Sequence, residues 1–155
     1  MNNLVPGEVQ FLDLADIHLQ EYENLLYEEA HVSDILASIQ DSYIIPADKF
    51  VFVVPEYNGG MPGILKLFID AMSVREMEPT FFMKKACLTG VSSGRAGNLR
   101  GMEHLTGVLN YLQVVVFPNR LPISRVESFI SGDKLVLDEE TRDAIDRQLT
   151  DFIEF

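Results

Sequence analysis

The sequence predicts an α/β protein with a parallel sheet and helices on both faces. Phe50–Val54 is a continuous run of β-branched and aromatic residues, which is typical of a strand buried on both faces. A helix at Ile64–Ser73 follows, with Pro62 near its first position, where a missing N–H costs nothing. A second strand at Lys85–Val91 and a second helix with apolar residues at helical spacing, Asn98–Leu112, repeat the alternation. Strands that alternate with helices favour a parallel sheet.

The other elements that we expect follow from caps, prolines and apolar patterns. In chain order they are a strand at Glu8–Leu14, an acidic surface connection at Ala15–His31, a helix capped by Ser33 and ended by Pro46, a strand at Val114–Phe117, an irregular extension at Arg120–Gly132, a short apolar segment at Lys134–Leu137, and a final helix capped by Asp138.

The composition indicates a single domain over residues 1–155. A chain of 155 residues can bury about two thirds of its unfolded surface. Hydrophobic residues make up 47% of the chain and charged residues 23%, which is ordinary for a soluble globular protein. The net charge of −12 argues against nucleic acid and anionic membranes as partners, because both require positive charge to replace counterions.

The single cysteine, Cys87, lies in an apolar stretch and has no partner for an internal disulfide. We expect it to be a small core residue, because a reactive thiol needs an exposed, electropositive site. The N-terminus shows no signal-peptide pattern, and no apolar run approaches the roughly 20 residues that span a bilayer. We therefore expect a cytoplasmic protein without a membrane segment.

Two glycine-containing loops each follow a predicted strand and precede a predicted helix. The first runs from Pro55 to Gly63 and the second from Ser92 to Gly97. Open α/β sheets bind ligands at the carboxyl ends of their strands, beside free backbone donors. Such loops can also serve only turn geometry and capping, so the residues alone leave both readings open.

Both loops resemble those of a known family. Pro55-Glu56-Tyr57-Asn58, with Pro62-Gly63-x-Leu65-Lys66-x-x-Ile69-Asp70 after it, resembles the flavin-contacting loop of the NADPH-dependent FMN reductases. That family has a flavodoxin-like fold and includes flavin, quinone, chromate and azo-dye reductases. Val91–Arg100 resembles its glycine-rich loop after the fourth strand, and Asp138–Arg142 is a weaker match. The resemblance runs from about Glu8 to Phe155 and implies a three-layer α/β/α fold of the flavodoxin type.

The resemblance also implies a cofactor site. FMN would be bound by two groups of residues, namely Pro55, Glu56, Tyr57, Asn58 and Gly59 in the first loop and Ser92, Ser93, Gly94 and Arg95 in the second. Tyr57 and Asn58 would edge the flavin ring, with the backbone N–H groups of Tyr57, Asn58 and Gly59 at its polar rim. The second loop would lie against the pyrimidine side of the ring. Arg95 and Arg100 are candidates for the phosphate of a nicotinamide dinucleotide, although for Arg100 we favour a solvated surface side chain.

The chain departs from the family at its beginning. The family opens with a strand and a Gly-Ser-x-Arg-x-x-Ser loop that binds the FMN phosphate, whereas this chain has no such loop before Pro55. We expect a domain that lacks this first strand and the phosphate loop, and is truncated relative to the family. In the strand order 2-1-3-4-5 the loss leaves a gap in the sheet, and unpaired buried backbone is costly. Three resolutions stay open: Glu8–Leu14 moves over to pair with Phe50–Val54, which we favour, another copy supplies a strand, or a separate polypeptide completes the sheet.

The function that the resemblance implies is an NAD(P)H-dependent oxidoreductase. FMN would take a hydride from NADPH and reduce a quinone, a flavin or a similar small acceptor. We assign no catalytic side chain, which such chemistry permits because the cofactor carries the hydride. The alternative is a non-enzymatic, degenerate flavodoxin-like module for dimerisation or interaction, without tight FMN binding. A small electron carrier fits the acidity but lacks a phosphate loop of its own, and whether the chain is an enzyme stays open.

Two further expectations concern metals and assembly. His18, His31 and His104 are scattered without the spacing of metal ligands, so we assign no metal site. The helix after Pro62 is apolar on most of its surface, which indicates burial on more than one side. The resemblance implies a homo-oligomer, a dimer or a tetramer, with this helix in the interface, and the alternative is a central core helix.

Overall fold

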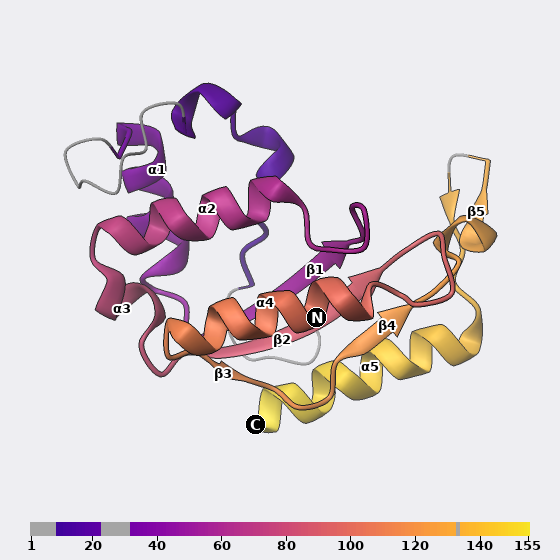
Figure 1. The fold of residues 1–155 in the computed structure, drawn as a ribbon. Coiled ribbons are helices and arrows are strands. Elements are labelled where there is room, and N and C mark those ends of the chain that lie inside the picture. The colour runs from indigo at the N-terminus through magenta and orange to yellow at the C-terminus, as the bar shows by residue number, and fades with distance from the viewer. Residues whose placement is uncertain (1–8, 23–31, 133) are drawn as a thin grey trace.

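The computed structural model describes residues 9–22, 32–132 and 134–155 (Figure 1). Its helices are the short η1 (Leu14–Asp16) and η2 (Leu19–Tyr22), α1 (Asp34–Ile39), the π-helix η4 (Gln40–Ile44), α2 (Gly63–Val74), α3 (Met77–Phe81), α4 (Leu99–Tyr111), η5 (Val126–Phe129) and α5 (Glu139–Glu154). Its strands are β1 (Lys49–Pro55), β2 (Lys85–Val91), β3 (Val115–Val116), β4 (Leu121–Ile123), β5 (Ile130–Ser131) and β6 (Lys134–Leu135). Of the expected acidic connection, residues 23–31 lie outside the described residues.

The main sheet is parallel, as predicted. β1 pairs with β2 over its whole length, from Lys49 opposite Lys85 to Pro55 opposite Val91. β3 and β4 share the other edge of β2, β3 at its start and β4 at its end. The predicted strand Val114–Phe117 is therefore only the first of two pieces, and the predicted irregular extension Arg120–Gly132 contains the second piece and β5.

A buried glutamine of α5 bridges the break between β3 and β4. Gln148 Nε2 donates to Leu88 O at 3.0 Å and to Asn119 O at 2.8 Å, and Gln148 Oε1 accepts from the Thr89 hydroxyl at 2.8 Å. Leu88 O belongs to the edge of β2 where a continuous neighbouring strand would have donated to it. The glutamine amide takes the place of that missing strand bond.

Helices α4 and α5 lie on opposite faces of the sheet. Thr89 bonds to Gln148 of α5, whereas a Cβ on the next residue, Gly90, would meet Met102 of α4 at 2.9 Å. Successive residues of a strand point to opposite faces, so these two contacts define the outer layers. The thiol of Cys87 is fully buried within β2, and burial raises its pKa to about 11, as expected for a core cysteine.

Helix α5 is fixed at both ends. Asp138 is its N-cap, as predicted, and accepts the Thr141 N–H at 2.7 Å. At the other end Lys49 Nζ donates to Phe152 O at 3.0 Å and to Ile153 O at 2.7 Å. A cation at the C-terminal carbonyls complements the helix dipole, so the start of β1 holds the end of α5.

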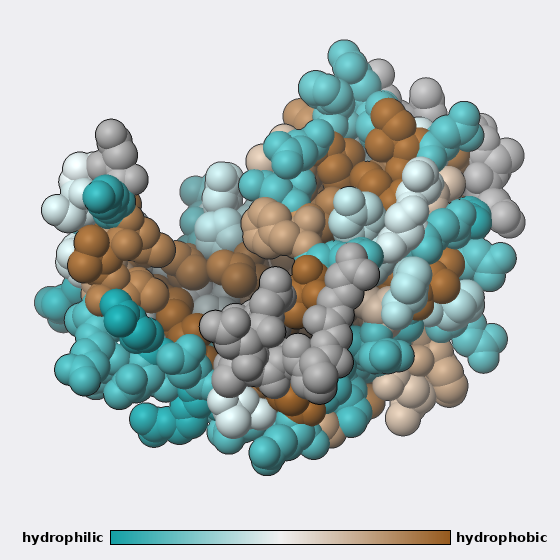
Figure 2. All heavy atoms as spheres, turned by 180° about the vertical axis from the view of Figure 1, so that it is seen from behind, coloured by the Kyte–Doolittle hydropathy of each residue, from teal (hydrophilic) through white to brown (hydrophobic). Residues whose placement is uncertain are grey.

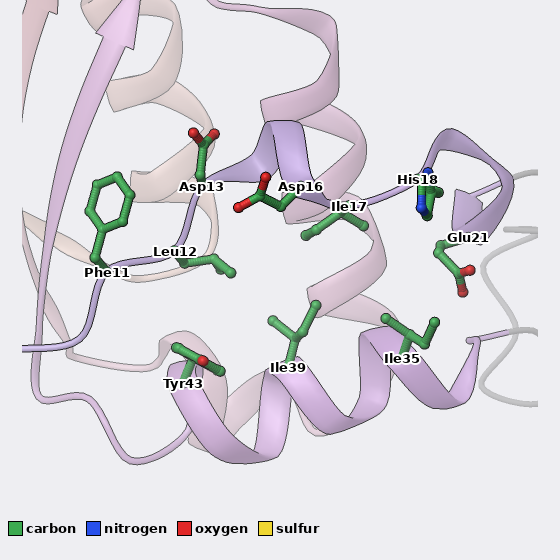
Figure 3. A pocket seen from close by; sticks show the side chains of 10 residues that line it. All are labelled: Phe11, Leu12, Asp13, Asp16, Ile17, His18, Glu21, Ile35, Ile39 and Tyr43. Carbon is green, nitrogen blue, oxygen red and sulfur yellow. The ribbon is translucent and has the colours of Figure 1, made fainter.

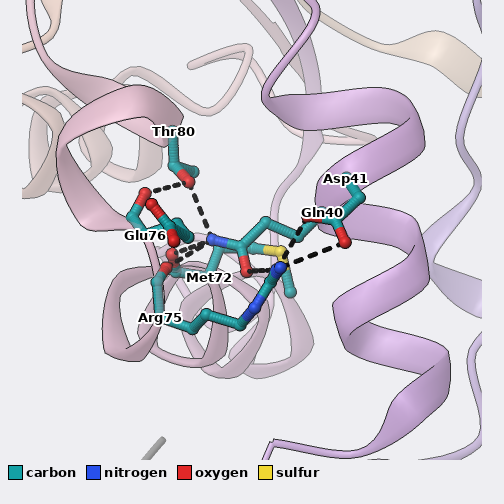
Figure 4. Close-up of polar contacts among 6 residues, drawn as sticks. All are labelled: Gln40, Asp41, Met72, Arg75, Glu76 and Thr80. Atoms are coloured by element: carbon teal, nitrogen blue, oxygen red, sulfur yellow. Dashed lines mark hydrogen bonds and ion pairs between the residues drawn. The ribbon is translucent and has the colours of Figure 1, made fainter.

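A second buried amide ties α1, η4, α2 and α3 together (Figure 4). Ser33 caps α1, as predicted, and the helix continues as a π-helix that begins at Gln40. Gln40 Nε2 lies within 2.6–2.9 Å of Met72 O, Arg75 O and Thr80 Oγ1. These acceptors come from the end of α2 and from α3, so the side chain of Gln40 links η4 to both of these helices.

The expected strand at Glu8–Leu14 is wrong for the residues that the structure describes. Residues 9–13 form no strand, Leu14 begins η1, and β1 has only β2 as a described partner. Asp13 Oδ1 accepts the Ala15 N–H at 2.9 Å, and this cap turns the chain out of an extended conformation. Leu12 and Leu14 pack on the core cluster while Phe11 is exposed.

Apolar side chains remain exposed at several places on the described surface, among them strand β1 and the β5–β6 hairpin. Val53 of β1 is 66% exposed, although its neighbour Val54 is fully buried. Ile130, Leu135 and Val136, on and beside the β5–β6 hairpin, are also exposed. In the view from behind, hydrophobic residues colour the projecting arm that holds this hairpin (Figure 2).

Candidate functional site

The two predicted ligand loops begin side by side at one edge of the sheet. Pro55 is opposite Val91 in the pairing of β1 with β2, and the Glu56 N–H donates to Val91 O at 2.8 Å. The first loop therefore leaves the sheet directly beside the second. The structure brings the two groups of predicted site residues together because the strands that carry them are neighbours in register.

The first loop is a tight turn with two left-handed residues. Tyr57 and Gly60 exchange N–H···O bonds of 3.0 Å in both directions, and between them Asn58 has φ 51° and Gly59 φ 77°. Positive φ at both central positions defines a type I′ turn. The Tyr57 N–H donates to Gly60 O inside the turn, and its contact with a flavin stays a prediction. Among the described residues the N–H groups of Asn58 and Gly59 have no acceptor, and the Tyr57 side chain is 63% exposed.

In the second loop the carbonyl oxygens are engaged by the segment after β4. Ser92 O accepts from Val126 N at 3.0 Å, Gly94 O from Arg125 N at 2.9 Å, and Arg95 O from the Ser124 hydroxyl at 2.7 Å. The N–H groups of Ser93, Gly94 and Arg95 have no acceptor among the described residues. A loop of this kind presents donors outward and can bind a carbonyl oxygen or an anion.

Ser92 differs from the rest of its loop. Its side chain is buried, its N–H donates to Ile123 O at 3.0 Å, and its hydroxyl donates to Gly94 O at 3.2 Å. The N–H, the carbonyl oxygen and the hydroxyl of Ser92 all form hydrogen bonds within the protein, so Ser92 stabilises the shape of the loop. The exposed members of the predicted set are Pro55, Glu56, Tyr57, Asn58, Ser93, Gly94 and Arg95, while Gly59 is partly buried.

Asn98 links the second loop to the end of β1, and this link was not predicted from the sequence. It is fully buried with φ 61°, its Nδ2 donates to Val54 O at 2.9 Å, and its Oδ1 accepts the Gly101 N–H at 3.1 Å. Asparagine is a common helix cap, so the sequence signal was present for the cap but not for the bond to β1. A Cβ on the preceding Gly97 would lie 2.5 Å from Pro122 Cβ, so this position requires glycine.

Arg100, in the first turn of α4 after the second loop, extends toward the turn of the first loop. A Cβ on Gly59 would be 3.9 Å from Arg100 Nη1, which places the guanidinium group against the turn of the first loop. The side chain is exposed, in agreement with the sequence prediction, but its position at this turn was not predicted.

A hollow of about 300 Å³ lies elsewhere, between the η1–η2 segment and the α1–η4 helices (Figure 3). Figure 3 shows side chains of both segments facing one another across it, with Ile35, Ile39 and Tyr43 on the helical side. None of the predicted site residues lines it. Within the described ranges no three His, Cys, Asp or Glu side chains gather as metal ligands, and no helix is long and apolar enough to cross a membrane.

Parallel strands, helices on both faces and paired loops at the carboxyl edge define an α/β protein of the flavodoxin type. The sequence pattern described as NADPH-dependent FMN reductase matches residues 2–127. The chain belongs to this family.

Curated relatives and a solved structure agree with this assignment. An NAD(P)H-dependent FMN reductase of Pseudomonas aeruginosa is 38% identical over 106 residues, which are 66% of this chain and 56% of that protein. A 2-hydroxy-1,4-benzoquinone reductase of a Burkholderia species is 32% identical over 120 residues, 76% of this chain and 66% of that protein. The chain thus spans somewhat more than half of the length of these relatives. The flavoenzyme NAD(P)H:(acceptor) oxidoreductase FerB of Paracoccus denitrificans superposes with a TM-score of 0.71 at 23% identity, over 99% of this chain and 85% of FerB, and it supports the fold alone.

Proposed function

We propose that this chain is an NAD(P)H-dependent flavin reductase that binds FMN across its two loops and reduces a quinone, a flavin or a similar small acceptor. The observation that carries the proposal is the second loop, in which three carbonyl oxygens are engaged while the N–H groups of Ser93, Gly94 and Arg95 have no acceptor among the described residues. The names of the relatives, an FMN reductase and a benzoquinone reductase, support the same chemistry.

The residues of the two loops fit the ring system of FMN. That ring carries carbonyl oxygens and nitrogens along its pyrimidine side, and the N–H groups of Ser93, Gly94 and Arg95 would donate to such a rim. The N–H groups of Asn58 and Gly59 would donate from the first loop, beside the exposed ring of Tyr57. Pro55 and Glu56 set the direction in which this loop leaves β1.

In this proposal the cofactor supplies the chemistry and the protein supplies its position. FMN, when bound, accepts a hydride from NAD(P)H and passes electrons to the acceptor. The Asn98 bond to Val54 O and the bonds from residues 124–126 hold the donor groups in place before a ligand arrives. Preorganised donors need no rearrangement on binding, which is the contribution of this scaffold.

We further propose that a partner completes the sheet and that the working protein is a cytoplasmic homo-oligomer. The open side of β1 and the exposed Val53 support a missing neighbour of the sheet, consistent with the predicted lack of the first strand. Helix α2 buries Leu65, Phe68, Ile69, Ala71 and Met72, which favours the core-helix reading for most of its surface. Leu67 is exposed, and we propose that it contacts the partner subunit.

Titration of the purified chain with FMN, followed by flavin fluorescence, tests the function. We expect saturable binding and consumption of NADPH when a quinone is added. No binding at tens of micromolar protein would refute the proposal and favour the non-enzymatic module. Tight binding without NAD(P)H consumption would favour an electron carrier instead.

A further inference from the structure

Arg100 carries a charge that no described residue balances. The chain has 24 acidic and 12 basic residues, so an arginine on its surface has many possible partners. Some other cations use them, since Lys66 pairs with Asp70 at 2.5 Å and Arg75 with Asp41 at 2.8 Å, whereas Arg95, Arg125 and Arg142 form no ion pair with a described residue. Arg100 forms no ion pair or hydrogen bond with any residue in the described ranges.

The nearest candidate partner of Arg100 is occupied. Glu103 lies three residues further along α4, a spacing that favours an ion pair on a helix. Its Oε2 is instead bound by Arg120 Nη1 at 2.5 Å, and Arg120 also donates to Thr106 Oγ1 at 3.3 Å. In this structure Glu103 pairs with Arg120 and forms no ion pair with Arg100.

The position of Arg100 on its helix makes an unbalanced cation unfavourable. It is the second residue of α4, and no acidic residue lies in the first turn. The helix dipole disfavours positive charge at this end and favours an anion. Its guanidinium group lies near Gly59, where an added Cβ would be 3.9 Å from Arg100 Nη1, and this places the charge beside the proposed FMN site.

We propose that Arg100 is a specificity-determining residue that binds a phosphate monoester of a ligand of this site. The proposal rests on the proposed function, because it assigns the anion to that site. A planar guanidinium group binds phosphate oxygens through two parallel hydrogen bonds. Two ligands of a flavin reductase carry such a group, FMN on its ribityl chain and NADPH on its adenosine ribose.

The test compares ligands with and without the phosphate. Affinities of FMN and riboflavin are measured by flavin fluorescence, and those of adenosine 2′,5′-bisphosphate and AMP by calorimetry, for the unaltered chain and for Arg100→Gln. Arg100→Lys, which keeps the charge, is a rescue variant. Arg142→Gln is the matched control, because Arg142 is exposed on α5 and its replacement changes the net charge by the same amount as Arg100→Gln.

We expect Arg100→Gln to weaken one phosphate-bearing ligand by about 10- to 100-fold, the effect of losing a charge-assisted hydrogen bond. Its partner without the phosphate should bind unchanged, Arg100→Lys should recover part of the loss, and Arg142→Gln should change nothing. A loss on FMN identifies the flavin phosphate, and a loss on the bisphosphate identifies that of NADPH. Equal losses within a pair, no loss, or no preference for phosphate in the unaltered chain would overturn the inference. A loss on the bisphosphate in a chain that binds no FMN would support the inference while refuting the proposed function.

Discussion

The replacement Gln148→Leu should cost this protein a large part of its stability. Gln148 is 1% exposed and uses its whole amide group, with two donated bonds and one accepted bond. Leucine removes all three bonds and keeps a similar volume. Asn119 is exposed and can bond to water, but Leu88 O and the Thr89 hydroxyl would stay buried without partners.

The magnitude follows from those two orphaned groups. Each unsatisfied buried polar group costs about 1–3 kcal/mol, so the variant should lose about 2–6 kcal/mol. The total stability of such a domain is about 5–15 kcal/mol, and the loss is therefore easy to measure. Equilibrium unfolding in urea, followed by circular dichroism, gives the change in the free energy of unfolding.

A double-mutant cycle with Thr89→Val tests the reasoning more sharply. Thr89→Val alone leaves Gln148 Oε1 without its donor, and the two replacements together remove both ends of that bond. The double variant should lose less free energy of unfolding than the two single variants lose together, because the effects of replacing two residues that share a hydrogen bond are not additive. A loss below about 0.5 kcal/mol for Gln148→Leu, the range of ordinary surface changes, would refute the bridging role, and strict additivity would refute the pairing with Thr89.

Four other outcomes follow from the described contacts. Gly97→Ala should destabilise by about 1–3 kcal/mol in urea unfolding, since its φ is +55° and a Cβ would strike β4, whereas Gly107→Ala, with open space around it inside α4, should stabilise by up to about 1 kcal/mol. Cys87, buried and with its pKa raised to about 11, should react with a thiol reagent at neutral pH only as fast as the protein unfolds, and fast labelling of the native protein would contradict its core position. Burial, with a smaller contribution from Glu21, raises the pKa of Tyr22 from 10.0 to about 12, so the stability that this group contributes is complete below pH 10 and is lost as the pH rises toward 12; Tyr22→Phe should remove that part of the decline in the urea midpoint. Val53→Lys should lower the melting temperature if a partner covers the open side of β1, and an unchanged melting temperature would indicate that this side faces water.

The sequence was sufficient for elements with a strong local signal. β1 and β2 follow from continuous apolar runs, and α5 begins directly after Asp138, the residue that was predicted to cap it. The placement of both loops at one edge follows from parallel pairing alone. These features depend on residues that are close in the chain, which is why a single sequence contains them.

Buried amides were not predictable in this way. Gln40 and Gln148 are polar residues in helices, and a glutamine in a helix is usually exposed, whereas these two are buried. Their burial depends on acceptors that lie 32 or more residues away for Gln40 and 29 or more for Gln148. The wrong prediction of a strand at Glu8–Leu14 has a local cause. The alternation of polar and apolar residues there was only rough, and the cap that Asp13 forms for η1 ends the extended conformation.

Strand β1 has the sequence of an interior strand at the edge of the described sheet. Lysine and proline, which commonly protect an edge from further pairing, stand only at the two ends of β1, and Phe50–Val54 between them contains no charge and no proline. The Glu56 N–H points to β2, so the backbone groups of Val51 and Val53 point to the open side. A strand along this side would satisfy those groups and cover Val53 at the same time. We propose one physical explanation for the predicted gap and the exposed valine, namely a neighbouring strand that pairs with the open side of β1.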